Sequence, residues 1–137
     1  MKNITFEKYQ GNGNDFIVID SRGNDLYKNY MINKIFDIKK ICNRQFGIGA
    51  DGVIFIEEPT HDNYAKMIIF NSDGSEAEMC GNGIRCLVEF LHVNDSMNNK
   101  NIEYKIETKA GLKIAKYIDE EITVKMGVPI LESQSIP

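Results

Sequence analysis

Alternating and continuously apolar segments, separated by polar loops, run through most of the chain. Strict alternation, as in residues 102–108, is typical of a strand with one buried face, and a short apolar run such as Phe16–Ile19 is typical of a buried strand. On these criteria we predict strands at residues 4–9, 15–20, 53–57, 64–70, 102–108, 112–118 and 122–126. The connections at 110–111 and 119–120 are short enough for the last three strands to form hairpins.

One amphipathic helix is predicted over residues 31–46. Its apolar stripe has the three- and four-residue spacing of a helix face and comprises Ile32, Ile35, Ile38 and Cys42. We expect Asn29 to cap its start and Gly47-Ile48-Gly49 to end it.

A second helix is predicted over residues 81–93, and it is apolar on most sides. Only Arg85, Glu89 and His92 form a polar stripe along it. Such a helix must be enclosed by the rest of the fold. The element order ββαββαβββ therefore predicts an α+β fold: a strongly bent, antiparallel or mixed sheet that forms a barrel-like lobe around this central helix.

Composition places the chain among soluble globular proteins, with 137 residues, 42% hydrophobic and 26% charged. The net charge is −4 without a run of Lys or Arg, which argues against nucleic-acid binding. The longest apolar runs have about four residues, whereas a membrane span needs about 20. Residues 1–6 lack the apolar core of a signal peptide. We therefore expect a cytoplasmic protein with no membrane partner.

The sequence does not point to a metal or nucleotide site. The three cysteines are an odd number in a chain without an export signal, so we expect no disulfide. Cys80 and Cys86 lie six residues apart, which is not the paired spacing of a structural zinc site. Gly47-x-Gly49-x-x-Gly52 has the spacing of a dinucleotide-binding loop, but it follows a helix and precedes a strand, the reverse of that motif's context.

Cys80 is the cysteine whose position suggests chemistry. It precedes Gly81-Asn82-Gly83 at the start of the second predicted helix, where amide groups and the helix dipole favour a thiolate. Cys42 and Cys86 lie on apolar faces, and we expect both to be buried and inert. From the residues alone two interpretations remain open, a cysteine-based enzyme and a redox-sensitive binding module.

Residues 71–86, NSDGSEAEMCGNGIRC, closely resemble the active-site signature of diaminopimelate epimerases. Residues 11–16 and 44–52 resemble two further blocks of that family, in the same order and spacing. The motif at 126–129 resembles the end of the family's first lobe. The resemblance covers essentially the whole chain.

This resemblance implies a fold of two similar lobes with the active site between them. It also implies a cofactor-independent enzyme, working without pyridoxal phosphate or a metal, that interconverts LL- and meso-diaminopimelate for lysine and peptidoglycan synthesis. By the same resemblance, Cys80 is one of two catalytic thiols. Asn14 and Asn71 contact the substrate, and Gly81 and Asn82 bind its carboxylate.

Only one glycine-flanked cysteine is present in the chain. We therefore expect residues 1–128 to be the N-terminal lobe and residues 129–137 to begin the connection to a second, C-terminal lobe that this chain lacks. Alone it should be inactive, and the apolar area at a half-built site favours a homodimer. The alternatives are another cofactor-independent amino-acid racemase or isomerase of this scaffold, such as the proline racemase type, and a non-catalytic binding lobe.

Overall fold

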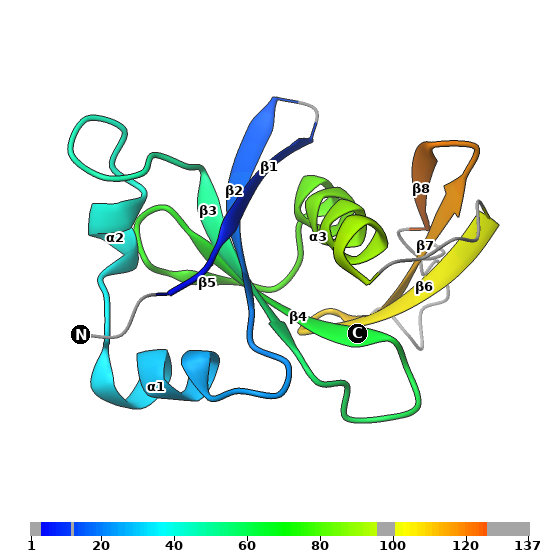
Figure 1. Cartoon of the computed structure of the whole chain (residues 1–137), viewed down its shortest axis with the longest axis horizontal. Coiled ribbons are helices and arrows are strands. Elements are labelled where there is room, and N and C mark those ends of the chain that lie inside the picture. The colour runs from blue at the N-terminus through cyan, green and yellow to red at the C-terminus, as the bar shows by residue number, and fades with distance from the viewer. Residues whose placement is uncertain (1–3, 12, 96–100, 126–137) are drawn as a thin grey trace, which may run out of the picture.

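The computed structural model describes residues 4–11, 13–95 and 101–125, which form a curled mixed sheet around a helix (Figure 1). In chain order the elements are β1 (Glu7–Gly11), β2 (Asn14–Asp20), α1 (Leu26–Asn33), α2 (Ile38–Ile41), β3 (Gly52–Glu57), β4 (Ala65–Asn71), β5 (Glu76–Ala77), α3 (Gly81–Asn94), β6 (Asn101–Thr108), β7 (Gly111–Ile118) and β8 (Glu121–Lys125).

The strand order in the sheet is β1-β2-β3-β4-β6-β7-β8, with β5 paired to β4. The β2/β3 and β4/β6 pairs are parallel and the others antiparallel. Figure 1 shows α3 lying between the β1–β2 hairpin and strands β6–β8, with α1 and α2 on the far side of the first strands. The predicted bent sheet around the 81–93 helix is confirmed.

The central strands are buried on both faces, which explains their continuous apolar runs. Along β2, Phe16 and Val18 pack into the cluster that contains α3, whereas Ile17 and Ile19 pack into a second cluster beneath α1 and α2. Successive strand side chains point to opposite faces, so one strand supplies both cores.

The α3 helix matches its predicted pattern. Its side chains Ile84, Leu87 and Leu91 are fully buried, and the predicted polar stripe lies at intermediate exposure. Val93, in the last turn, is 58% exposed and was expected to be buried.

The single helix predicted over residues 31–46 is wrong. Helix α1 ends earlier, because Lys34 adopts a left-handed conformation with φ 48°. Helix α2 is a separate turn started by Asp37, whose side chain accepts hydrogen bonds from the amides of residues 39 and 40. Asn29 lies inside α1 rather than capping a helix. The break places Phe36 against the rings of Tyr30 and Phe55.

On the predicted apolar stripe of that helix, Ile38 and Cys42 are buried, as expected. Ile32 and Ile35 are 77% and 42% exposed, because they belong to a different helix and to the connecting loop.

Two other predictions need small corrections. The first strand begins at Glu7 rather than Ile4, and the segment between the strand predicted over 64–70 and the helix predicted over 81–93 contains the short strand β5, for which no strand was predicted. The predicted hairpins are confirmed, although the connection between β6 and β7 is residues 109–110 rather than 110–111. In the β7–β8 connection, Asp119 and Glu120 both have positive φ, 49° and 68°, as a type I′ turn requires.

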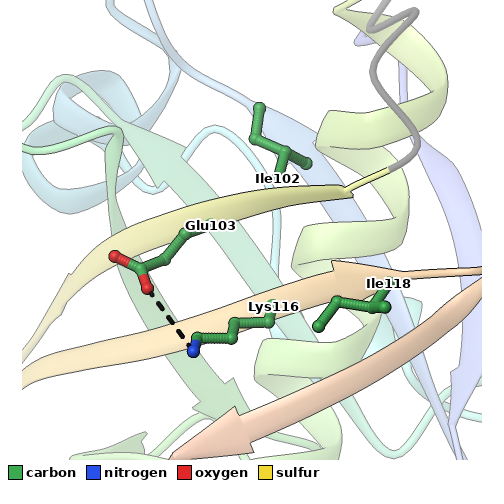
Figure 2. A pocket seen from close by; sticks show the side chains of 4 residues that line it. All are labelled: Ile102, Glu103, Lys116 and Ile118. Carbon is green, nitrogen blue, oxygen red and sulfur yellow. Dashed lines mark ion pairs between the residues drawn. The ribbon is translucent and has the colours of Figure 1, made fainter.

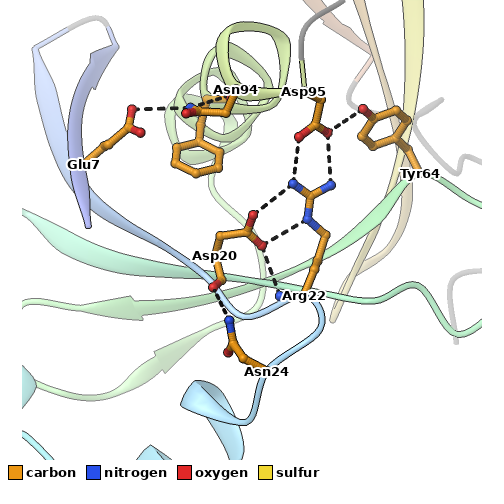
Figure 3. Close-up of polar contacts among 8 residues, drawn as sticks. Glu7, Asp20, Arg22, Asn24, Tyr64, Asn94 and Asp95 are labelled. Carbon is orange, nitrogen blue, oxygen red and sulfur yellow. Dashed lines mark hydrogen bonds and ion pairs between the residues drawn. The ribbon is translucent and has the colours of Figure 1, made fainter. Parts of the chain in front are cut away.

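A cluster of polar side chains holds the C-terminal end of α3 (Figure 3). Asp95, the residue after the helix, accepts hydrogen bonds of 3.0 and 2.9 Å from the Arg22 guanidinium and one of 2.5 Å from Tyr64 Oη. Arg22 also donates to both carboxylate oxygens of Asp20, at 3.0 Å. This Arg22–Asp95 clamp ties α3 to the end of β2 and the segment before β4.

The motif at 126–129 and the boundary expected at residue 129 lie outside the described residues. Within the ranges that the structure describes, no helix is long and apolar enough to cross a membrane.

Candidate active site

Cys80 lies at the N-terminus of α3 in extended backbone conformation, with φ −149° and ψ 122°. The first hydrogen bond of the helix ladder runs from the amide of Ile84 to the carbonyl of Cys80, at 3.0 Å. The amides before Ile84 stand at the positive end of a 14-residue helix. The Cys80 side chain is partly exposed at this end.

Two glycines allow the start of α3 to approach its surroundings closely. A Cβ atom on Gly83 would lie 2.8 Å from Ile69 Cδ1 of β4. A Cβ atom on Gly11 would lie 3.3 Å from the Asn82 carbonyl oxygen. The first turn of α3 therefore packs against both the sheet and the β1–β2 hairpin, and this packing determines where Cys80 lies.

Two of the predicted substrate contacts meet directly. Asn82 Nδ2 donates a hydrogen bond of 2.6 Å to Asn14 Oδ1, joining residues 68 positions apart. Gly81 occupies the first helical position beside them.

Asn71 lies at the same end of the sheet. The strand register pairs it with Gly52, and Gly52 with Phe16, which places it two strands from the start of β2. Its side chain is exposed and donates to Ser75 Oγ at 3.1 Å.

The three thiols differ in their surroundings. All are free, and Cys42 and Cys86 are buried as predicted. Burial raises the pKa of the Cys42 thiol to about 11 and that of Cys86 to about 12. Cys80 is only partly buried, so among the three it is the thiol that solvent and small molecules reach.

A charged network next to Asn14 was not assigned a role from the sequence. Asp51 Oδ2 accepts from Asn14 Nδ2 at 3.2 Å, and its Oδ1 accepts from Arg44 at 3.1 Å. Arg44 also donates to both oxygens of Asp15, at 2.7 and 3.1 Å, and Lys8 lies 3.0 Å from the same carboxylate. The sequence did hold one indication of this network, because Asp15, Arg44 and Asp51 all fall within the motif blocks at 11–16 and 44–52.

A shallow hollow over β6 and β7 offers less chemistry (Figure 2). It is lined by Ile102, Ile118 and the Glu103–Lys116 ion pair, whose charged atoms are 4.0 Å apart. It contains none of the predicted site residues. Within the described part of the chain, no group of three or more His, Cys, Asp or Glu residues could hold a metal ion. The N-terminal end of α3, with a partly exposed Cys80 and the Asn14–Asn82 pair, is the candidate active site.

Comparison with known proteins gives consistent matches. The family model for diaminopimelate epimerase matches residues 6–132. The diaminopimelate epimerase of Prochlorococcus marinus (strain NATL2A) is 55% identical over the whole chain, and that of Methanocella arvoryzae is 48% identical. The chain covers 48% of each relative, so it spans about half the length of the curated relatives it matches.

Solved structures with lower sequence identity share the fold. A phenazine biosynthesis protein from Bacillus anthracis has a TM-score of 0.60 at 21% identity, over 90% of this chain and 40% of that one. A probable proline racemase from Agrobacterium radiobacter has a TM-score of 0.62 at 19% identity, over 83% of this chain and 37% of that one.

Proposed function

Because the chain belongs to the diaminopimelate epimerase family, we propose that it supplies one half of an enzyme that interconverts LL- and meso-diaminopimelate without pyridoxal phosphate. The reaction serves lysine and peptidoglycan synthesis. The observation that carries the proposal is a partly exposed Cys80 at the N-terminus of a buried helix, beside the Asn14–Asn82 pair. A catalytic thiol must stay reduced, which favours the cytoplasm.

Inversion of the α-carbon suits one acid–base group on each of its faces. The α-proton of an amino acid is very weakly acidic, so the site must stabilise developing negative charge by electrostatics. In our proposal the Cys80 thiolate removes the α-proton from one face, and a thiol on the opposite face delivers a proton to the carbanion. Reversal of the two roles gives the reverse reaction.

The second thiol comes from the other half of the enzyme in this proposal. Cys42 and Cys86 do not suit the role, because both are buried and burial raises their pKa values to about 11 and about 12. The half-length match to the relatives supports a site completed by residues beyond those described.

Substrate binding uses the start of α3. The amides of Gly81 and Asn82 stand at the positive end of the helix, which suits the α-carboxylate of the substrate. Asn14 and Asn71, at the same end of the sheet, are the proposed side-chain contacts.

A chimera tests this proposal. Residues 1–137 replace the matched half of the 55% identical Prochlorococcus enzyme, and epimerisation of LL-diaminopimelate is followed by chiral chromatography. We expect activity, and a loss of at least about 1,000-fold in Cys80→Ala, as for removal of an essential acid–base group. Cys42→Ala is the matched control and should retain activity if the chimera stays folded by circular dichroism. A folded Cys80→Ala chimera with full activity would refute the assignment.

The isolated chain should be inactive. We expect no conversion of LL- into meso-diaminopimelate at the rate of the chimera, followed by chiral chromatography, because one thiol reaches only one face of the α-carbon. Size-exclusion chromatography under the same conditions reports whether the chain is a monomer. Full-rate epimerisation by a monomer would contradict a site built from two halves.

A further inference from the structure

Asp51 makes contacts that reach the candidate active site. It lies just before β3, and its carboxylate accepts three hydrogen bonds: from Asn14 Nδ2 at 3.2 Å, from the amide of Asp15 at 3.0 Å and from Arg44 at 3.1 Å. Asp15 and Asp51 also bond through their backbones, since the Asp51 amide donates to the Asp15 carbonyl at 2.9 Å. The carboxylate is therefore held in place from several directions.

These contacts determine which way the Asn14 amide faces. An ionised carboxylate only accepts hydrogen bonds, so Asn14 must turn its NH₂ group towards Asp51. Its oxygen then faces Asn82, which donates through Nδ2 at 2.6 Å. The Asp51 carboxylate thus fixes the orientation of the Asn14 amide, and Asn14 in turn fixes that of the Asn82 amide in the first turn of α3.

We infer that Asp51 is a positioning residue that sets the amide orientation of Asn14 and Asn82 for substrate binding. The inference rests on the proposed function for its catalytic consequence, but the contacts themselves do not depend on it. Arg44 completes the arrangement, because its guanidinium pairs with both Asp51 and Asp15 and holds the two carboxylates together.

Asp51→Asn is the informative substitution because it keeps the shape of the side chain. An amide has one accepting and one donating end. If its oxygen faces Asn14 and the Asp15 amide, its NH₂ faces the Arg44 guanidinium, and donor meets donor. In the other orientation, its NH₂ meets the donors Asn14 and Asp15. In the first orientation Asn14 keeps its acceptor but the anchor that Arg44 gives residue 51 is lost, and in the second the hydrogen bond from Asn14 itself is lost. In both cases Asn14 is less firmly held in one amide orientation.

Nuclear magnetic resonance of the ¹⁵N-labelled 137-residue chain tests the hydrogen bonds from Asp51 through Asn14 to Asn82 without any assay of activity. In Asp51→Asn we expect the side-chain NH₂ signals of both Asn14 and Asn82 to shift and to exchange faster with solvent. Asp62→Asn, the same change in an exposed loop, should leave both signals in place. An unchanged Asn82 signal in folded Asp51→Asn would overturn the inference.

Kinetics of the chimera test the consequence for binding. We expect Asp51→Asn to raise KM about tenfold with kcat within about threefold, as when ground-state and transition-state binding weaken together. A purely structural defect would lower the folded fraction and the apparent kcat but leave KM unchanged, and that result would overturn the inference. An inactive wild-type chimera would count against the proposed function, and the magnetic resonance result would then decide the role of Asp51.

Discussion

Cys80 differs from the other two cysteines in both exposure and backbone position. It is partly exposed at the N-terminus of α3, where solvent and reagents reach the sulfur. Cys42 and Cys86 are 5% and 2% exposed, and burial favours their neutral thiols. Reactivity should follow this contrast, because the thiolate is the nucleophile.

We therefore predict that iodoacetamide at neutral pH labels Cys80 first in the folded chain. Peptide mass mapping at short times should show alkylated Cys80 and little alkylated Cys42 or Cys86. In urea all three should react at similar rates, which serves as the control. Equal labelling of the three in the folded chain would contradict the assignment of the buried helix face.

At the scale of single residues, the candidate active site could be predicted in part from the sequence. The position of Cys80 at a helix start and the burial of Cys42 and Cys86 followed from local pattern. The pairing of Asn14 with Asn82 and the role of Asp51 could not be derived from that pattern, because these contacts span 68 and 37 residues. They depend on the parallel β2/β3 pairing and on the packing of α3 against the hairpin, which local periodicity does not encode.

At the scale of single elements, the strands, hairpins and α3 were predictable, but the region around residues 31–46 was not. The spacing of apolar residues favoured one helix there, but spacing alone takes no account of a polar residue that can cap the start of a second helix. Asp37 caps a new turn, and Lys34 takes a left-handed conformation that ends the first helix. The aromatic stacking of Phe36 on Tyr30 stabilises this break.

The type I′ turn between β7 and β8 leads to a stabilising substitution. Glu120 has φ 68°, a conformation that costs a residue with a Cβ atom about 1–2 kcal/mol and costs glycine little. We expect Glu120→Gly to raise the free energy of unfolding by about 0.5–1 kcal/mol, measured by urea denaturation, after the greater entropy of glycine in the unfolded chain is subtracted. Glu121→Gly, at the adjacent strand position, should lower it, and a gain in both variants would disprove the turn argument.

The Arg22–Asp95 clamp leads to a pH-dependent prediction. Burial alone would raise the pKa of Asp95, but hydrogen bonds from Arg22 and Tyr64 outweigh it and hold that pKa below its usual value. Because the folded-state pKa is lowered, the stabilisation is complete above about pH 4 and is lost as pH falls through the folded-state pKa.

Asp95→Asn should therefore lower the free energy of unfolding at pH 7 by about 1 kcal/mol, a modest value because the pair is partly exposed. The difference from wild type should shrink as the pH is lowered from 4 towards 2, since the wild-type carboxyl group becomes protonated. Urea denaturation at several pH values measures both effects. A difference that stays constant down to pH 2 would show that the charge of Asp95 does not stabilise the fold.

On the scale of the whole molecule, the mixed sheet serves two cores at once. Strand β2 packs on α3 with one face and beneath α1 and α2 with the other, so changes on either face alter the strand that begins with Asn14. A bent sheet around the central helix could be predicted from the apolar character of residues 81–93. The strand order could not, because both parallel pairs join segments separated by helices.

The parallel join between β4 and β6 is short, with only the pairs Ala65↔Ile106 and Lys66↔Glu107, whereas β3 and β4 are matched over six positions and β6 and β7 over eight. Strands β6–β8 are therefore attached to the central sheet by this short join, by hydrogen bonds from the segment before β4 to Lys105 and Glu107, and by packing on α3. Detached from α3, a three-stranded unit loses its apolar support and unravels. The fold should thus contain two cooperative units of unequal stability.

Native-state hydrogen exchange tests whether the fold contains these two cooperative units. Amides of β6 and β7 should exchange together, through a partial opening with a lower free energy than global unfolding, while those of β2, β3 and β4 should exchange only on global unfolding. If both groups report the same opening free energy, the lobe unfolds as one unit. With the expected result, the strands that enclose α3 on one side open and close while the sheet that carries Asn14 stays intact. The first turn of α3 would then stay joined to Asn14 through Asn82, and Cys80 would keep its place during these openings.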